Sequence, residues 1–247
     1  MARQRVEGAG LQWQEAADAQ QLAERLGNTV AQCLRSALEQ HGEASLVVSG
    51  GSTPAPVLRY LSGVDLDWSR VSVTLADERW VPPGHPDSNE SLVRETLLQD
   101  KAATARFVPL YREGLSESDA LPVVAADISA MHQPFTVVML GMGGDGHTAS
   151  LFPDAAAEEL LPAMALDNED VVAFLHPPSV SQARISLTRA CLLHAENRFL
   201  HITGDAKCDV LAAALDSCEG GDWQAGHAPV LGLLTEQPAR ASVFWSP

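Results

Sequence analysis

The strongest constraint on the fold of this chain is an apolar run that passes directly into a glycine-rich turn. Residues 137–140 are Val-Val-Met-Leu, and four of the six residues at 141–146 are glycine. Such glycines let the backbone adopt conformations that other residues avoid, and they let a ligand approach closely. A buried strand that ends in such a turn is typical of open α/β sheets, which place their ligand sites at the carboxyl ends of the strands. The segment therefore predicts a strand of such a sheet followed by a ligand-binding loop.

Apolar strands and amphipathic helices alternate along the rest of the chain. A long helix is expected over residues 15–40, because apolar residues recur every four positions from Leu22 to Leu38, and Gly42 is expected to end it. Further helices are expected over residues 54–63, 88–98, 120–131 and 205–215, and strands over residues 44–48, 71–76, 107–110, 135–140, 171–175, 184–187, 199–203 and 243–244. This alternation predicts an α/β fold, with a mostly parallel sheet and helices on both faces.

Length and charge narrow the class of protein. A chain of 247 residues can bury a large core, and we expect a single α/β domain over residues 1–247, with residues 153–170 as a candidate small subdomain. The net charge of −16 argues against a nucleic-acid partner, because phosphate backbones attract basic surfaces. A small phosphorylated substrate needs only a few local cations and stays open.

Cysteine content and hydropathy indicate the compartment. Residues 1–10 are polar and show no signal peptide, and no apolar run approaches the ~20 residues that span a bilayer. We therefore expect a cytoplasmic protein without a membrane partner. The cysteines have no metal-ligand spacing and fit reduced thiols; they are Cys33, Cys191, Cys208 and Cys218.

The first polar motif follows the strand expected at 44–48. It reads Ser-Gly-Gly-Ser-Thr-Pro and leads into a helix. Small residues before a helix expose backbone N–H groups and the positive end of the helix dipole, so Gly50, Gly51, Ser52 and Thr53 are candidates to bind a phosphate. The alternative is an ordinary helix start that Ser52 or Thr53 caps. The motif is not a Walker A loop, because the Gly-Lys-Ser/Thr ending is missing.

Charged side chains lie at the ends of other expected strands. Asp77-Glu78-Arg79 follows an apolar strand, where Arg79 could grip a phosphate and Asp77 could fix a hydroxyl or a histidine. A local salt bridge at the strand end explains the same residues equally well. Lys207, in the first turn of an expected helix, and Arg184, which opens a strand, are weaker phosphate-binding candidates, since most such cations are simply solvated. Because the carboxyl ends of parallel strands meet at one edge, these elements are expected to share one crevice.

The glycine turn carries an acid and a histidine two residues apart, Asp145 and His147. Histidine is the side chain best suited to move a proton at neutral pH, so His147 is the candidate general base and Asp145 a candidate to orient its ring. The backbone N–H groups of Gly143 and Gly144 are candidates to stabilise an oxyanion. The alternative is a tight turn with a surface histidine. No cofactor and no metal site is expected, because the sequence contains no ligand cluster.

These motifs together resemble the 6-phosphogluconolactonase family. The resemblance spans about residues 15–245 and rests on residues 49–54, 77–82 with 87–89, 141–153 and 203–207. It implies a modified Rossmann-like α/β fold. It also implies metal-free hydrolysis of 6-phospho-D-glucono-1,5-lactone to 6-phospho-D-gluconate in the oxidative pentose phosphate pathway. The implied partner is a phosphorylated sugar lactone, and monomer and homodimer both stay open.

The sequence leaves two alternatives to the lactonase function. Glucosamine-6-phosphate deaminases are similar in the glycine loop, but they carry a carboxylate five residues after the histidine, where this chain has Phe152. That difference favours the lactonase. A non-catalytic sugar-phosphate sensor is the other alternative. The presence of both Asp145 and His147 argues against it, because a binding module needs no proton carrier.

Overall fold

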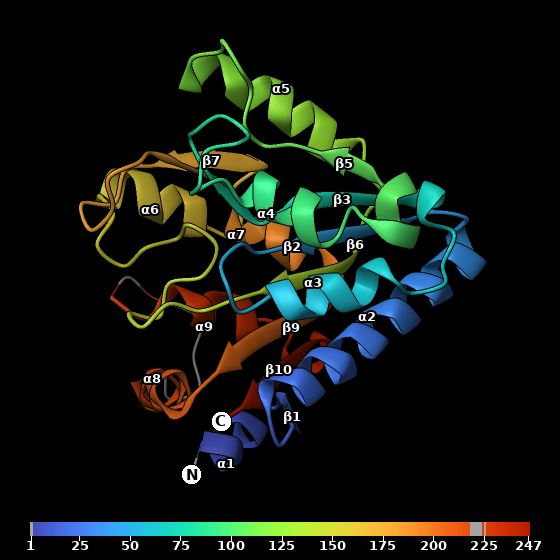
Figure 1. The fold of residues 1–247 in the computed structure, drawn as a ribbon. Helices are drawn as coiled ribbons and strands as arrows, with labels where there is room; N and C mark the ends of the chain where they lie inside the picture. The colour runs from blue at the N-terminus through green and yellow to red at the C-terminus, as the bar shows by residue number, and fades with distance from the viewer. Residues whose placement is uncertain (1, 218–223, 225) are drawn as a thin grey trace.

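A seven-stranded sheet forms the centre of the molecule in the computed structural model, which describes residues 2–217, 224 and 226–247 (Figure 1). Its strands lie in the order β1-β10-β9-β6-β2-β3-β5, and every neighbouring pair is parallel. Their bounds are β1 Gln12–Glu15, β2 Ala44–Val48, β3 Val71–Leu75, β5 Arg106–Val108, β6 Phe135–Leu140, β9 Ala195–Thr203 and β10 Ala241–Ser246. The predicted α/β class with a mostly parallel sheet is confirmed.

Helices cover both faces of this sheet (Figure 1). Their bounds are α1 Ala2–Gly8, α2 Ala19–His41, α3 Ala55–Ser62, α4 Asn89–Thr96, α5 Glu117–Ser129, α6 Ala157–Met164, α7 Arg189–Leu193, α8 Asp205–Ser217 and α9 Pro229–Leu234. In the described part of the chain, no helix is both long and apolar enough to cross a membrane. The thiols of Cys33, Cys191 and Cys208 are free, and Cys218 lies outside the described residues.

Helix α2 shows how local sequence sets the ends of these elements. The Asp18 side chain caps its first turn, and Gly42, with a φ of 83°, ends it in the left-handed conformation that glycine adopts without strain. The predicted apolar stripe is fully buried from Leu22 to Leu34. The predicted start at residue 15 is wrong, because residues 12–15 pair with β10 as an edge strand. Helices α1 and α9 are not predicted from the sequence, because they are too short to show a helical period.

The chain order creates a crevice between β2 and β6. From β2 the chain moves outward through β3 to β5, whereas from β6 it moves the other way through β9 to β10. Connections that leave two neighbouring strands in opposite directions open a space beyond their carboxyl ends, which is where α/β sheets bind ligands. The two strand ends are joined by a hydrogen bond from the Ser49 N–H to the Met139 carbonyl (3.0 Å).

A second, three-stranded antiparallel sheet stands beside this crevice. It consists of β4 (Asp77–Arg79), β8 (Arg184–Leu187) and β7 (Val172–Leu175), with β8 in the middle. The predicted strands at 171–175 and 184–187 therefore exist, but they lie outside the parallel sheet. Pairing of β4 with β8 places Arg79 directly opposite Arg184. Nothing local in the sequence of either strand encodes this long-range pairing.

Residues 153–170, the candidate subdomain, hold the short helix α6. His176 joins it to α5: its Nδ1 lies 2.8 Å from Glu159 Oε1, and its Nε2 lies 3.2 Å from Glu117 Oε2. A carboxylate only accepts hydrogen bonds, so an imidazole that contacts one through each nitrogen does so best as the doubly protonated imidazolium. The hydrogen bond to Glu159, helped by Glu117, raises the pKa of His176 above its ordinary value.

Candidate active site

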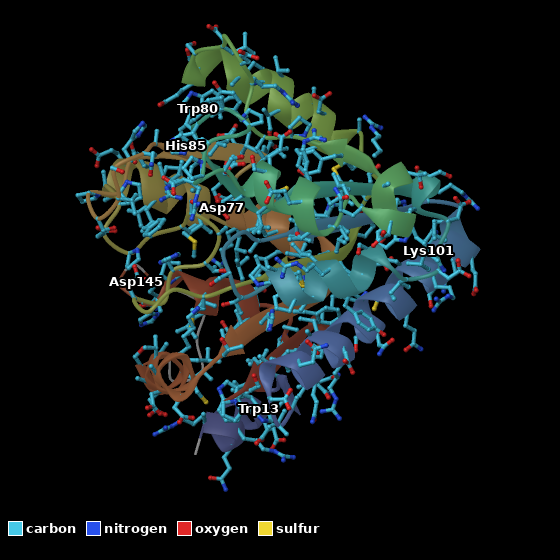
Figure 2. All side chains as sticks on the ribbon, viewed as in Figure 1. Trp13, Asp77, Trp80, His85, Lys101 and Asp145 are labelled. Atoms are coloured by element: carbon cyan, nitrogen blue, oxygen red, sulfur yellow. The ribbon has the colours of Figure 1, made fainter. Side chains whose placement is uncertain are left out.

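A pocket of about 370 Å³ opens at the carboxyl ends of β2 and β6. The structure brings into its wall predicted residues from five separate segments of the chain, namely Gly50, Gly51, Ser52, Thr53, Asp77, Arg79, Gly143, His147, Arg184 and Lys207. Gly144 and Asp145 belong to the same turn as His147 but do not line the pocket. Figure 2 shows Asp145 near the outside of the molecule and Asp77 closer to its centre.

The glycine turn fixes the imidazole of His147 through Asp145. His147 Nδ1 lies 2.6 Å from Asp145 Oδ1, and the same oxygen accepts a hydrogen bond from the His147 backbone N–H (3.1 Å). With Nδ1 facing a carboxylate, Nε2 is the nitrogen left to exchange a proton with a molecule in the pocket. A Cβ on Gly143 would lie 2.2 Å from the imidazole, so only glycine leaves room for the ring in this position.

The turn is also closed by its own backbone. The Gly143 N–H donates to the His147 carbonyl (2.9 Å), and the Gly146 N–H donates to the Gly143 carbonyl (3.1 Å). The Gly143 N–H thus has an acceptor within the turn, whereas the Gly144 N–H donates to no acceptor among the described residues. The oxyanion role of Gly143 and Gly144 stays a prediction.

Asp77 connects the second sheet to the glycine loop. Its Oδ2 accepts a hydrogen bond from Ser150 Oγ (2.6 Å), and its backbone carbonyl accepts one from Asn89 Nδ2 (2.9 Å). Asp77, Asn89 and Ser150 are all buried. Ser150 lies in the predicted motif, yet its partnership with Asp77 is set by tertiary packing across 73 residues and had no signal in the sequence.

Glu78 is a further residue whose role the sequence analysis missed. It is fully buried, and its carboxylate accepts hydrogen bonds from the backbone N–H groups of Arg79, Asn89 and Glu90 at 2.7–2.8 Å, and from Ser88 Oγ at 3.2 Å. Burial raises the pKa of Glu78 to about 7, against the opposing effect of the three N–H groups. The hydrogen bonds of the Glu78 side chain hold the first turn of α4 against β4. No ion pair joins Asp77, Glu78 and Arg79 to one another in the described structure, so the salt-bridge alternative fails.

The hydrogen bonds to Glu78 place Asn89 against Gly50, in the loop that follows β2. A Cβ on Gly50 would lie 1.8 Å from Asn89 Oδ1, so the close approach of the two segments requires glycine there. The alternative that Ser52 or Thr53 caps α3 is wrong: Pro54 occupies the N-cap position, with no side-chain cap hydrogen bond. Ser52 and Thr53 both line the pocket instead.

Comparison with known proteins identifies the family of this chain. The family model described as glucosamine-6-phosphate isomerases/6-phosphogluconolactonase matches residues 17–245. The chain belongs to this family. A 6-phosphogluconolactonase from Mesorhizobium japonicum is 40% identical over the whole of both chains, and one from Pseudomonas aeruginosa is 46% identical over 84% of this chain and 86% of its own. The crystal structure of a 6-phosphogluconolactonase from Shewanella baltica superposes with a TM-score of 0.89 at 35% identity, covering 96% of this chain and 98% of that one.

Three cationic side chains line the pocket, namely Arg79, Arg184 and Lys207. Arg79 Nη1 donates to the Asp87 carbonyl (2.6 Å), but the Nε atoms of Arg79 and Arg184 are buried without a hydrogen-bond partner among the described residues. Burial and the neighbouring Arg79 lower the pKa of Arg184. Two cations that face each other are mutually destabilising unless an anion lies between them. With Lys207 on the first turn of α8, they form a site suited to a small anion.

Among the residues that the structure describes, no three side chains of His, Cys, Asp or Glu are grouped so that they could hold a metal ion.

Proposed function

We propose that this family member hydrolyses 6-phospho-D-glucono-1,5-lactone to 6-phospho-D-gluconate, with His147 as general base. One observation carries the proposal: an imidazole oriented by a carboxylate shares one pocket with three cations. The names of the curated relatives support the substrate class. The oxidative pentose phosphate pathway and the cytoplasmic location expected from the sequence belong to this proposal.

The substrate phosphate is assigned to the cation end of the pocket. Arg79 and Arg184 each offer a buried Nε–H group that has no partner in the described part of the chain, and Lys207 adds a third positive charge. The hydroxyls of Ser52 and Thr53 are further donors in the same wall. Binding a remote phosphate in this way orients the lactone without consuming any of its reactive groups.

The lactone carbonyl is assigned to the glycine-turn end. Nε2 of His147 takes a proton from a water molecule as that water attacks the carbonyl carbon, and Asp145 stabilises the imidazolium that forms. When the tetrahedral intermediate collapses, the imidazolium gives the proton to the departing ring oxygen. Assistance of this kind contributes roughly 10²–10⁴-fold, which suits an ester that also opens unaided.

The deaminase alternative is disfavoured by Phe152. An apolar, buried ring stands at the position from which a carboxylate would have to assist the histidine. The sensor alternative gives no reason for an imidazole held by Asp145 inside the pocket.

The test is the rate of lactone hydrolysis by the purified protein, corrected for the uncatalysed rate. We expect turnover of the phosphorylated lactone, poor turnover of unphosphorylated gluconolactone, and a fall of about 10²-fold or more in His147→Ala. Equal use of the two lactones would remove the phosphate assignment. Turnover near that of the wild type in His147→Ala would remove the general base.

A further inference from the structure

Phe152 contacts both the glycine-turn end and the cation end of the pocket. Its ring stacks on the imidazole of His147, with ring centroids 4.0 Å apart and planes inclined by 23°. The guanidinium carbon of Arg184 lies 5.9 Å from the centroid of the same ring. Only 6% of Phe152 is exposed, so the ring is held by its surroundings rather than free to turn.

The chain makes a tight turn to bring Phe152 onto His147. The Leu151 N–H donates to the Thr148 carbonyl (3.0 Å), and Ala149 between them has a φ of +48°. This left-handed conformation is uncommon for a residue other than glycine and marks a backbone that its surroundings constrain. Residues five apart in sequence thereby come face to face.

The contact removes a motion that the Asp145 hydrogen bond leaves open. One hydrogen bond at Nδ1 holds the imidazole at a single point, about which the ring can still rock out of its plane. A ring stacked on the flat face blocks that rocking. The two constraints act in perpendicular directions, and together they fix where Nε2 points.

We propose that Phe152 is a positioning residue for the reaction, which sets the plane of the His147 imidazole and at the same time supports the Arg184 guanidinium. This inference rests on the proposed function. Phe152 touches no reacting atom; it acts through His147, and an aromatic face also attracts the positive charge that develops on the imidazole during the reaction.

The test compares Phe152→Leu with Phe199→Leu. Phe199 is a matched control, because it is equally buried (5% exposed) and makes an aromatic contact with Phe244 (5.4 Å) away from the pocket. We expect Phe152→Leu to lower kcat about 10-fold or more with a smaller change in KM, since loss of orientation affects the chemical step most. Phe199→Leu should lower thermal stability but leave kcat within about threefold. Phe152→Tyr keeps the ring and should restore most of kcat.

An NMR measurement separates this inference from the proposed function. The imidazole of His147 stacks on the Phe152 ring, so the resonances of its ring C–H protons should be shifted upfield by the ring current in the wild type. Phe152→Leu should remove that shift, and Phe199→Leu should not. Absence of lactonase activity with the shift present would overturn the proposed function alone. Unchanged kcat in Phe152→Leu, or no ring-current shift in the wild type, would overturn the role of Phe152.

Discussion

Substitution of Gly143 by alanine should disable the site without any change to a polar group. A Cβ at Gly143 would lie 2.2 Å from Cε1 and Nδ1 of His147 and 2.6 Å from Asp145 Oδ1. Carbon atoms pack at about 3.5–4.0 Å, so the imidazole would have to retreat by roughly 1.3 Å or more. A misplacement of about 1 Å at a reacting group can cost about 10²-fold in rate, or about 2.7 kcal/mol of activation free energy.

The matched control is the next residue. A Cβ at Gly144 meets nothing within 4 Å among the described residues, and alanine there keeps the backbone N–H that is an oxyanion candidate. Neither glycine has a positive φ, so alanine is compatible with the backbone at both positions. We expect kcat for the phosphorylated lactone to fall about 10²-fold in Gly143→Ala and to stay within about threefold in Gly144→Ala, with both proteins folded by circular dichroism. Similar kcat values for the two variants would refute the claim that the space above Gly143 is what positions His147.

Three further results are expected. Arg79→Ala and Lys207→Ala should each raise KM by roughly 10- to 150-fold in steady-state assays, because a charge-assisted contact contributes about 1.5–3 kcal/mol; a change confined to kcat would contradict phosphate binding by that side chain. Ser150→Ala should lower the free energy of urea-induced unfolding by about 1–3 kcal/mol, because it leaves the buried Asp77 oxygen without its donor. The raised pKa of His176 stabilises the fold fully below pH 6.5, and that contribution is lost as pH rises through the higher folded-state pKa. Unfolding free energies should therefore show a small loss above pH 6.5 that His176→Ala lacks, and equal pH profiles would disprove it.

The sequence predicted that the segments following the parallel strands share one pocket, because the carboxyl ends of parallel strands lie at the same edge of a sheet. Gly50 and His147 follow β2 and β6, Asp77 comes two residues after β3, and the carboxyl ends of these parallel strands meet at one edge of the sheet. Their gathering in one pocket follows from the order of the elements, without knowledge of any side-chain contact.

The contribution of Arg184, which comes from the antiparallel sheet, could not be predicted in this way. Arg184 enters the pocket because β8 pairs with β4 in one register, and a shift by a single residue would turn its side chain to the other face. The hydrogen bond that the Gly143 N–H makes within the turn could not be predicted either. Glycine in a turn indicates conformational freedom, but it does not tell which N–H groups the turn itself uses.

The carboxylates and the guanidinium groups of this pocket differ in their hydrogen-bond partners. This difference explains how a protein with a net negative charge can bind an anion. The Asp77 carboxylate accepts a hydrogen bond from Ser150, and the Glu78 carboxylate accepts hydrogen bonds from backbone N–H groups, so both hold the walls in place. The guanidinium groups of Arg79 and Arg184 keep buried Nε–H donors that no acceptor in the described structure satisfies. A net charge of −16 repels a phosphate at long range, but salt screens that field beyond about 10 Å at 0.1 M. Affinity for a phosphate must therefore arise from contacts inside the pocket, where the unfilled donors are.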